Sequence, residues 1–90
     1  MNYENPIDTK AATDLLVAAS GGLPCGAKVV DLSMAGRDGI VLADLPDNDV
    51  TPYVSWRFVA GLPGYFFGHY SPSLIQARAD FRDRVRRRDA

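Results

Sequence analysis

The stretch that decides the fold is PYVSWRFVAGLPGYFFGHY, residues 52–70, because it concentrates the large aromatic side chains of the chain. It contains the only tryptophan, the only histidine, three of the four tyrosines and three of the four phenylalanines. Two aromatic-rich runs on either side of a GLPG loop are typical of a β-hairpin. We therefore predict two antiparallel strands here, with most of their side chains in the core of a small domain.

The register of this hairpin decides which aromatics are buried. If residues 61–64 connect the strands, Trp56 lies across from His69. One face then collects a large set in which His69, when protonated, is the only side chain that carries a charge: Val54, Trp56, Phe58, Ala60, Tyr65, Phe67 and His69. A slip of one residue turns every side chain of the second strand to the other face. Phe66 and Tyr70 would then point inward, and His69 would stand opposite Arg57. The first register is favoured because it gives the larger apolar face, but turn geometry leaves the second one open.

Outward from this hairpin, residues 27–46 (AKVVDLSMAGRDGIVLADLP) predict a first hairpin. Val30, Leu32 and Met34 recur with the two-residue period of a half-buried strand. GRDG supplies the turn, since Asp-Gly is a common hairpin connection. The sequence therefore predicts four strands in two consecutive hairpins.

Amphipathic segments flank the strands. Residues 5–22 predict an N-terminal helix that starts at Asn5 and stops at the two glycines that end the segment. Residues 71–90 predict a C-terminal helix with Ser71 as its N-cap, an i,i+4 pair of Asp83 with Arg87, and an apolar stripe of Leu74, Ala77, Phe81 and Val85.

The predicted fold class is therefore α+β, with the element order α-β-β-β-β-α. We expect a four-stranded antiparallel β-sheet with an N-terminal and a C-terminal helix on one face, as a two-layer sandwich. With 90 residues, a single domain spanning 1–90 is the natural division.

Composition restricts the class of protein. Hydrophobic residues make up 47% and charged residues 23%, as in soluble globular domains. The start of the sequence lacks the basic region and apolar run of a signal peptide, and no apolar segment is long enough to span a bilayer. A lone cysteine, Cys25, fits a reducing compartment. We expect a cytoplasmic protein without a membrane partner.

Groups that could perform catalysis are scarce. His69 is the only histidine, and nothing in the spacing brings it to the thiol of Cys25. The acidic turn around Asp47 does not match a calcium loop, and one histidine with one cysteine cannot build a zinc site. We therefore expect no metal, no cofactor and no enzymatic activity.

Two candidate binding surfaces remain. The face opposite the predicted core leaves an aromatic patch with one cation, a composition typical of protein interfaces: Tyr53, Arg57, Phe66 and Tyr70. It predicts contact with a host protein or protein complex, or a homodimer.

The second surface is a run of cations at the end of the predicted C-terminal helix: Arg84, Arg86, Arg87 and Arg88. Residues 71–90 have a formal balance of +3, against −4 for residues 1–70. Such arginines suit the phosphates of a nucleic acid, although a pI of 5.6 is low for a dedicated nucleic-acid-binding protein. Nucleic-acid binding is the alternative function.

Three motifs in succession, PYVSWRF, YFFGHY and ARADFRDRV, resemble small uncharacterised proteins encoded by phages and other mobile elements of bacteria. The resemblance covers residues 52–85, and Phe67 stands before Gly68 where that pattern has tryptophan. It implies a fold and, by analogy, action through binding. The expected function is a small non-enzymatic binding protein that inhibits a host defence system, as anti-CRISPR proteins do, through protein–protein contact.

Overall fold

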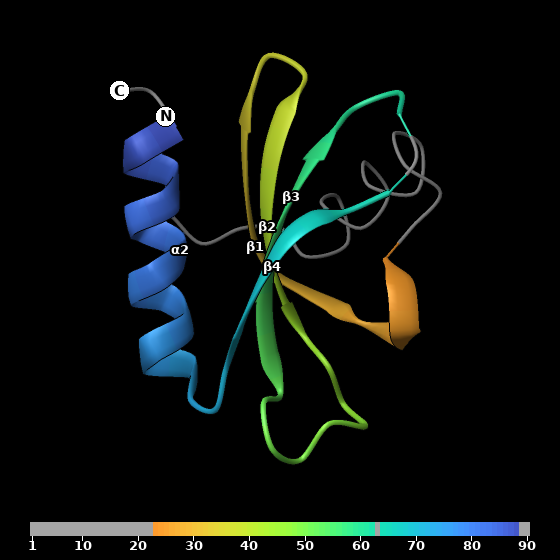
Figure 1. Ribbon diagram of the computed structural model, residues 1–90, viewed down its shortest axis with the longest axis vertical. Coiled ribbons are helices and arrows are strands. Elements are labelled where there is room, and N and C mark those ends of the chain that lie inside the picture. Colours follow the sequence, from red (N-terminus) through yellow and green to blue (C-terminus); the bar gives the residue numbers. More distant parts are fainter. Residues whose placement is uncertain (1–22, 63, 89–90) are drawn as a thin grey trace.

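The structure is a computed structural model that describes residues 23–62 and 64–88. Four strands follow a short 3-10 turn and precede one helix: η1 (Pro24–Gly26), β1 (Lys28–Ala35), β2 (Asp38–Asp44), β3 (Tyr53–Val59), β4 (Phe66–Ser71) and α2 (Leu74–Arg88). The strands form one antiparallel sheet in the order β1-β2-β3-β4, with α2 standing beside it (Figure 1). The predicted sheet and C-terminal helix are confirmed. The helix predicted over residues 5–22 lies outside the described residues.

Helix α2 packs on one face of the sheet through the predicted stripe. Ala77, Phe81 and Val85 are buried against Ile40 and Leu42 of β2. The helix begins later than the sequence suggested, because the Gln76 amide donates to Ser73 Oγ (3.2 Å) and Ser71 still belongs to β4. Ser73 therefore occupies the N-cap position that we assigned to Ser71.

A second apolar cluster lies on the opposite face of the sheet. It contains Trp56 and Phe58 and six smaller side chains: Val29, Leu32, Val41, Ala43, Leu45 and Val54. Because successive residues of a strand point to opposite faces, Val41 joins this cluster while Ile40 and Leu42 join the α2 cluster. The sequence placed the core on the Trp56 face, whereas α2 packs on the other side of the sheet and forms a second cluster there.

The favoured register of the second hairpin is also wrong. Ser55, not Trp56, pairs with His69, and Val54 pairs with Tyr70. Further along, Arg57 pairs with Phe66, so that Phe67 and Gly68 together lie opposite Trp56 in a β-bulge. His69 and Tyr70 consequently lie on the faces given by the slipped register, although His69 faces Ser55 and not Arg57.

The first hairpin turns two residues before the predicted Asp-Gly. Ala35 pairs with Asp38 around Gly36 and Arg37, and Gly36 has a φ of 61°. A glycine with positive φ at the first central position is what a type II′ turn requires. Arg37 also ties this turn to the end of β3, since its Nε and Nη2 donate to the Ala60 carbonyl at 3.1 and 2.9 Å.

Candidate anion-binding site

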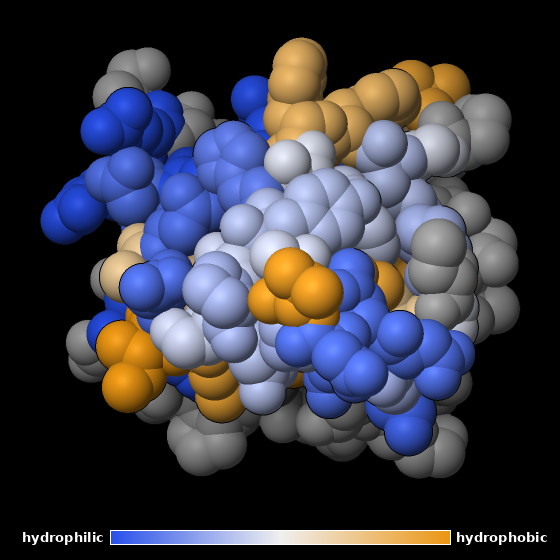
Figure 2. Space-filling model, turned by 60° about the horizontal axis from the view of Figure 1, so that its bottom comes forward, coloured by the Kyte–Doolittle hydropathy of each residue, from blue (hydrophilic) through white to orange (hydrophobic). Residues whose placement is uncertain are grey.

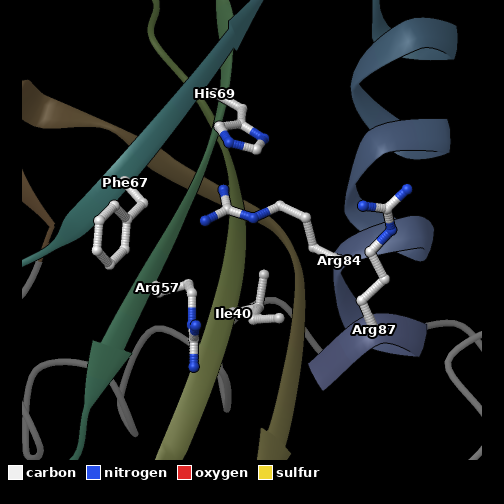
Figure 3. A pocket seen from close by; sticks show the side chains of 6 residues that line it. All are labelled: Ile40, Arg57, Phe67, His69, Arg84 and Arg87. Carbon is white, nitrogen blue, oxygen red and sulfur yellow. The ribbon is translucent and has the colours of Figure 1, made fainter. Parts of the chain in front are cut away.

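A cleft of about 300 Å³ opens between α2 and the sheet (Figure 3). Each neighbouring element contributes to its lining: Ile40 from β2, Arg57 from β3, Phe67 and His69 from β4, and Arg84 and Arg87 from α2. Three of these six side chains are guanidinium groups, and none is acidic. We refer to this hollow as the arginine cleft.

Arg84 forms the wall of the cleft that joins α2 to the sheet. Its side chain extends from the helix across to the strands (Figure 3). There Nη1 donates to both the carbonyl oxygen (2.9 Å) and the Oγ (2.8 Å) of Ser55. Burial is the main cause that lowers the pKa of Arg84; nearby Arg57 lowers it further, and Asp80 opposes both. The edge formed by Nε and Nη2 is not used in these bonds and can donate to a ligand.

His69 is held at the cleft by Asp80. The Nδ1 atom of His69 lies 2.9 Å from Asp80 Oδ2, with the imidazole half exposed. Ser55 Oγ donates to the same carboxylate oxygen at 3.2 Å. The carboxylate therefore orients the ring and leaves Nε2 for the cleft. In this arrangement the Ser55 hydroxyl bonds to the acid and not to the imidazole, which is not the order of a nucleophilic triad.

Phe67 projects from the β-bulge with 73% of its surface exposed. Its φ of 53° lies in the left-handed region that bulky residues rarely adopt. Gly68 permits this local path, because a Cβ there would lie 3.0 Å from Trp56 Nε1 and 2.9 Å from Tyr70 Cε1. The bulge thus turns Phe67 away from the Trp56 cluster, where the sequence placed it, and toward the arginines.

The two remaining arginines of the cleft differ in their partners. Arg87 Nε pairs with Asp83 Oδ2 at 2.9 Å, which confirms the predicted i,i+4 pair. Arg86 pairs with the other oxygen of the same carboxylate at 3.1 Å. Arg57 has no acidic partner among the described residues. The cleft therefore holds one guanidinium without an acidic partner, one partly neutralised guanidinium, and the partly buried Arg84.

The aromatic patch predicted for protein contact is divided between the two faces of the sheet. Tyr70 lies on the Trp56 face, half exposed, with its ring 6.4 Å from that of Trp56. It lines a separate hollow of about 290 Å³ with Leu45, Asp47, Asn48 and Trp56. Tyr53 packs partly buried against the α2 cluster. Arg57 and Phe66 line a smaller hollow beside the arginine cleft.

The arginine run is divided as well. Arg84 and Arg87 line the cleft, whereas Arg86 is exposed on α2 and does not line it. The side chain of Arg88 lies outside the described part of the chain, as does that of Cys25. Phe67 and His69 are cleft residues that the sequence assigned to the core. Their outward direction follows from the β-bulge. The adjacent Phe67 and Gly68 permit a bulge, but nothing in the sequence marks that one forms at this position.

The face in view in Figure 2 is mostly hydrophilic, with separated hydrophobic spots. Within the described ranges, no group of three or more His, Cys, Asp or Glu residues could hold a metal ion. No helix of those ranges is long and apolar enough to cross a membrane. Comparisons with protein-family models, curated proteins and solved structures found no match to this chain.

Proposed function

We propose that this chain is a small non-enzymatic binding protein that holds an anionic partner in the arginine cleft. The observation that carries the proposal is that Arg57, Arg84 and Arg87 line one hollow that has no acidic lining residue. Guanidinium groups are the side chains best suited to bind carboxylate or phosphate through paired hydrogen bonds.

The electrostatics of the cleft support an anionic occupant. Burial is the main cause that lowers the pKa of Arg84, the neighbouring Asp80 opposes it, and Arg57 adds a smaller lowering contribution. An anion between these groups replaces repulsion among cations with attraction in a partly desolvated site. Binding of an anion is therefore expected to stabilise the folded protein as well.

The charge distribution of the whole chain also favours binding of an anion near the C-terminal end of α2. Helix α2 carries six arginines against two aspartates. Its C-terminal end lies at the opposite end of the molecule from the β2–β3 loop, which contains Asp47 and Asp49 (Figure 1). This polarity steers an anionic partner toward α2.

A role as an inhibitor of a host defence system remains a prediction from the resemblance of residues 52–85. It is compatible with the cleft, because a target protein or complex with an acidic or phosphate-bearing surface would be engaged there. A homodimer also remains a prediction, made from the aromatic patch of Tyr53, Arg57, Phe66 and Tyr70.

The test is equilibrium binding of a labelled inorganic polyphosphate, followed by fluorescence anisotropy at increasing salt. Arg57→Gln and Arg87→Gln should each weaken binding about tenfold, the equivalent of about 1.4 kcal/mol. Arg86→Gln is the matched control, because Arg86 shares Asp83 with Arg87 but does not line the cleft. Equal losses in all three variants, or no salt-dependent binding, would contradict the proposal.

A further inference from the structure

We infer that the anionic partner is a single-stranded nucleic acid, with a phosphate between the guanidinium groups and an unpaired base stacked on Phe67. This inference rests on the proposed function and adds the chemical class of the partner. It depends on three observations: the strain and exposure of Phe67, its position between two hollows, and the donor geometry of the arginines.

Phe67 is poorly explained by folding alone. Holding a non-glycine residue at left-handed φ costs about 1–2 kcal/mol, and its φ is 53°. With 73% of its surface exposed, the ring recovers little of this cost through burial. Strained backbone that survives without a packing reason is concentrated at functional sites. A large flat ring presented to solvent next to cations is a surface for a planar ligand.

The position of Phe67 fits a chain that passes from one hollow to the next. Phe67 and Arg57 line the arginine cleft, and both also line a second hollow of about 180 Å³, whose lining includes the acidic Asp38. Phe66 contributes to that second hollow and is 45% exposed. Alternating cations and exposed aromatic rings along one path are how proteins bind single strands, with backbone phosphates on the cations and bases on the rings.

The arginines supply the geometry that a phosphate needs. Arg84 is held by two hydrogen bonds from Nη1 to Ser55, which leave Nε and Nη2 able to donate to a phosphate. Arg57 and Arg87 line the same cleft from β3 and α2. A duplex hides the faces of its bases in the stack, so only an unpaired base can reach the Phe67 ring. A carboxylate side chain of an acidic peptide has no aromatic face to offer it.

The experiment compares three labelled probes of similar charge with the full chain: oligo(dT), inorganic polyphosphate and poly-glutamate. Phe67→Leu removes the aromatic ring but keeps an apolar side chain, and Phe67→Trp enlarges the ring. We expect Phe67→Leu to weaken oligo(dT) binding about tenfold, within the range for loss of one stacked base, and to leave polyphosphate binding unchanged. Phe67→Trp should match or exceed the affinity of the wild type for oligo(dT).

Tyr70→Leu is the matched control, because it removes a half-exposed aromatic ring from the opposite face of the sheet. Its affinity for oligo(dT) should equal that of the wild type. If Phe67→Leu changes no affinity while polyphosphate still binds in the cleft, the inference is overturned and the proposed function stands. Tighter binding of poly-glutamate than of oligo(dT) overturns it in favour of an acidic peptide. Absence of binding to all three probes overturns both.

Discussion

Arg84 fastens α2 to the central part of the sheet through Ser55, whose carbonyl oxygen and Oγ both accept hydrogen bonds from Nη1, at 2.9 and 2.8 Å. Ser55 is only 2% exposed, so removing the donor leaves a buried carbonyl without this partner. Arg84→Met should therefore lower the free energy of unfolding by about 1.5–3 kcal/mol, as expected for hydrogen bonds from a charged group. Urea denaturation measures the change.

Combining Arg84→Met with Ser55→Ala isolates the contribution of the hydrogen bond between Arg84 and the Ser55 Oγ. A double-mutant cycle should give a favourable coupling energy between the two residues, of about 0.5–3 kcal/mol. A coupling energy near zero would mean that the Oγ contact adds nothing to stability. Because Arg84 has this structural role, Arg57 and Arg87 are the better positions for testing ligand binding.

Asp31 predicts a pH-dependent stability. Burial raises its pKa above the ordinary 3.8, against opposing contributions from the Leu32 amide, Arg78 and Arg82. When a carboxyl binds its proton more tightly in the folded state, the protein loses stability as the pH rises. The loss occurs between the pKa of that carboxyl in the unfolded chain and its higher pKa in the folded protein. Asp31→Asn should therefore be more stable than the wild type at neutral pH. The difference should vanish below the ordinary pKa, where both forms are uncharged.

Comparison of the two unfolding curves as a function of pH isolates Asp31 from the other carboxyls. Asp83, for example, acts in the opposite sense, because its hydrogen bond with Arg86 lowers its pKa. The asparagine amide oxygen can still accept from the Leu32 amide, which donates to Asp31 Oδ1 at 2.8 Å. A less stable Asp31→Asn variant at neutral pH would show instead that the charge attraction of Arg78, 3.9 Å away, outweighs burial.

Phe67→Gly should not harm the fold. Glycine adopts positive φ without steric cost, and this relief roughly offsets the larger backbone entropy that glycine loses on folding. We expect the free energy of unfolding to stay constant or rise by up to about 1 kcal/mol. Phe66→Gly, one residue earlier and without positive φ, should cost stability. If thermal or urea unfolding shows that Phe67→Gly destabilises the protein more than Phe66→Gly does, the positive φ at Phe67 is contradicted.

Gly39→Ala tests the packing under the first hairpin. A Cβ at this position would collide with the ring of Phe58 and lie 2.9 Å from Met34 Sδ. Phe58 is 2% exposed and cannot move freely, so the added methyl should destabilise the protein by about 1–3 kcal/mol. Gly36→Ala is not an equivalent control, because Gly36 has open space but a positive φ. A neutral Gly39→Ala variant would mean that Phe58 repacks.

Local patterns were enough to predict much of the fold. The spacing of Ala77, Phe81 and Val85 predicted which side of α2 is buried, because helical periodicity is a property of the chain itself. Alternation likewise predicted four strands in two hairpins. It did not predict that β2 is buried on both faces, since a strand shows this only when elements from elsewhere in the sequence cover each side.

The candidate site was less accessible to sequence analysis. The arginine run contained Arg84 and Arg87, and the aromatic stretch contained Arg57, but the sequence assigned them to two different surfaces. These arginines line one cleft with Phe67 and His69 because β4 contains one extra residue. This β-bulge changes the face of the sheet on which the following side chains lie. A pattern with a two-residue period carries no mark of where that residue is inserted.

The sequence by itself therefore determined the element types, their order from β1 to α2, and the concentration of arginine in the last helix, since all of these depend on neighbours within a few positions. Only the tertiary structure decided the register of β4, the face on which α2 packs, and the meeting of three guanidinium groups with an exposed ring. These features arise from contacts between residues far apart in the chain, among them Arg84 with Ser55. Small differences in packing free energy select one such arrangement among several that satisfy the same local pattern.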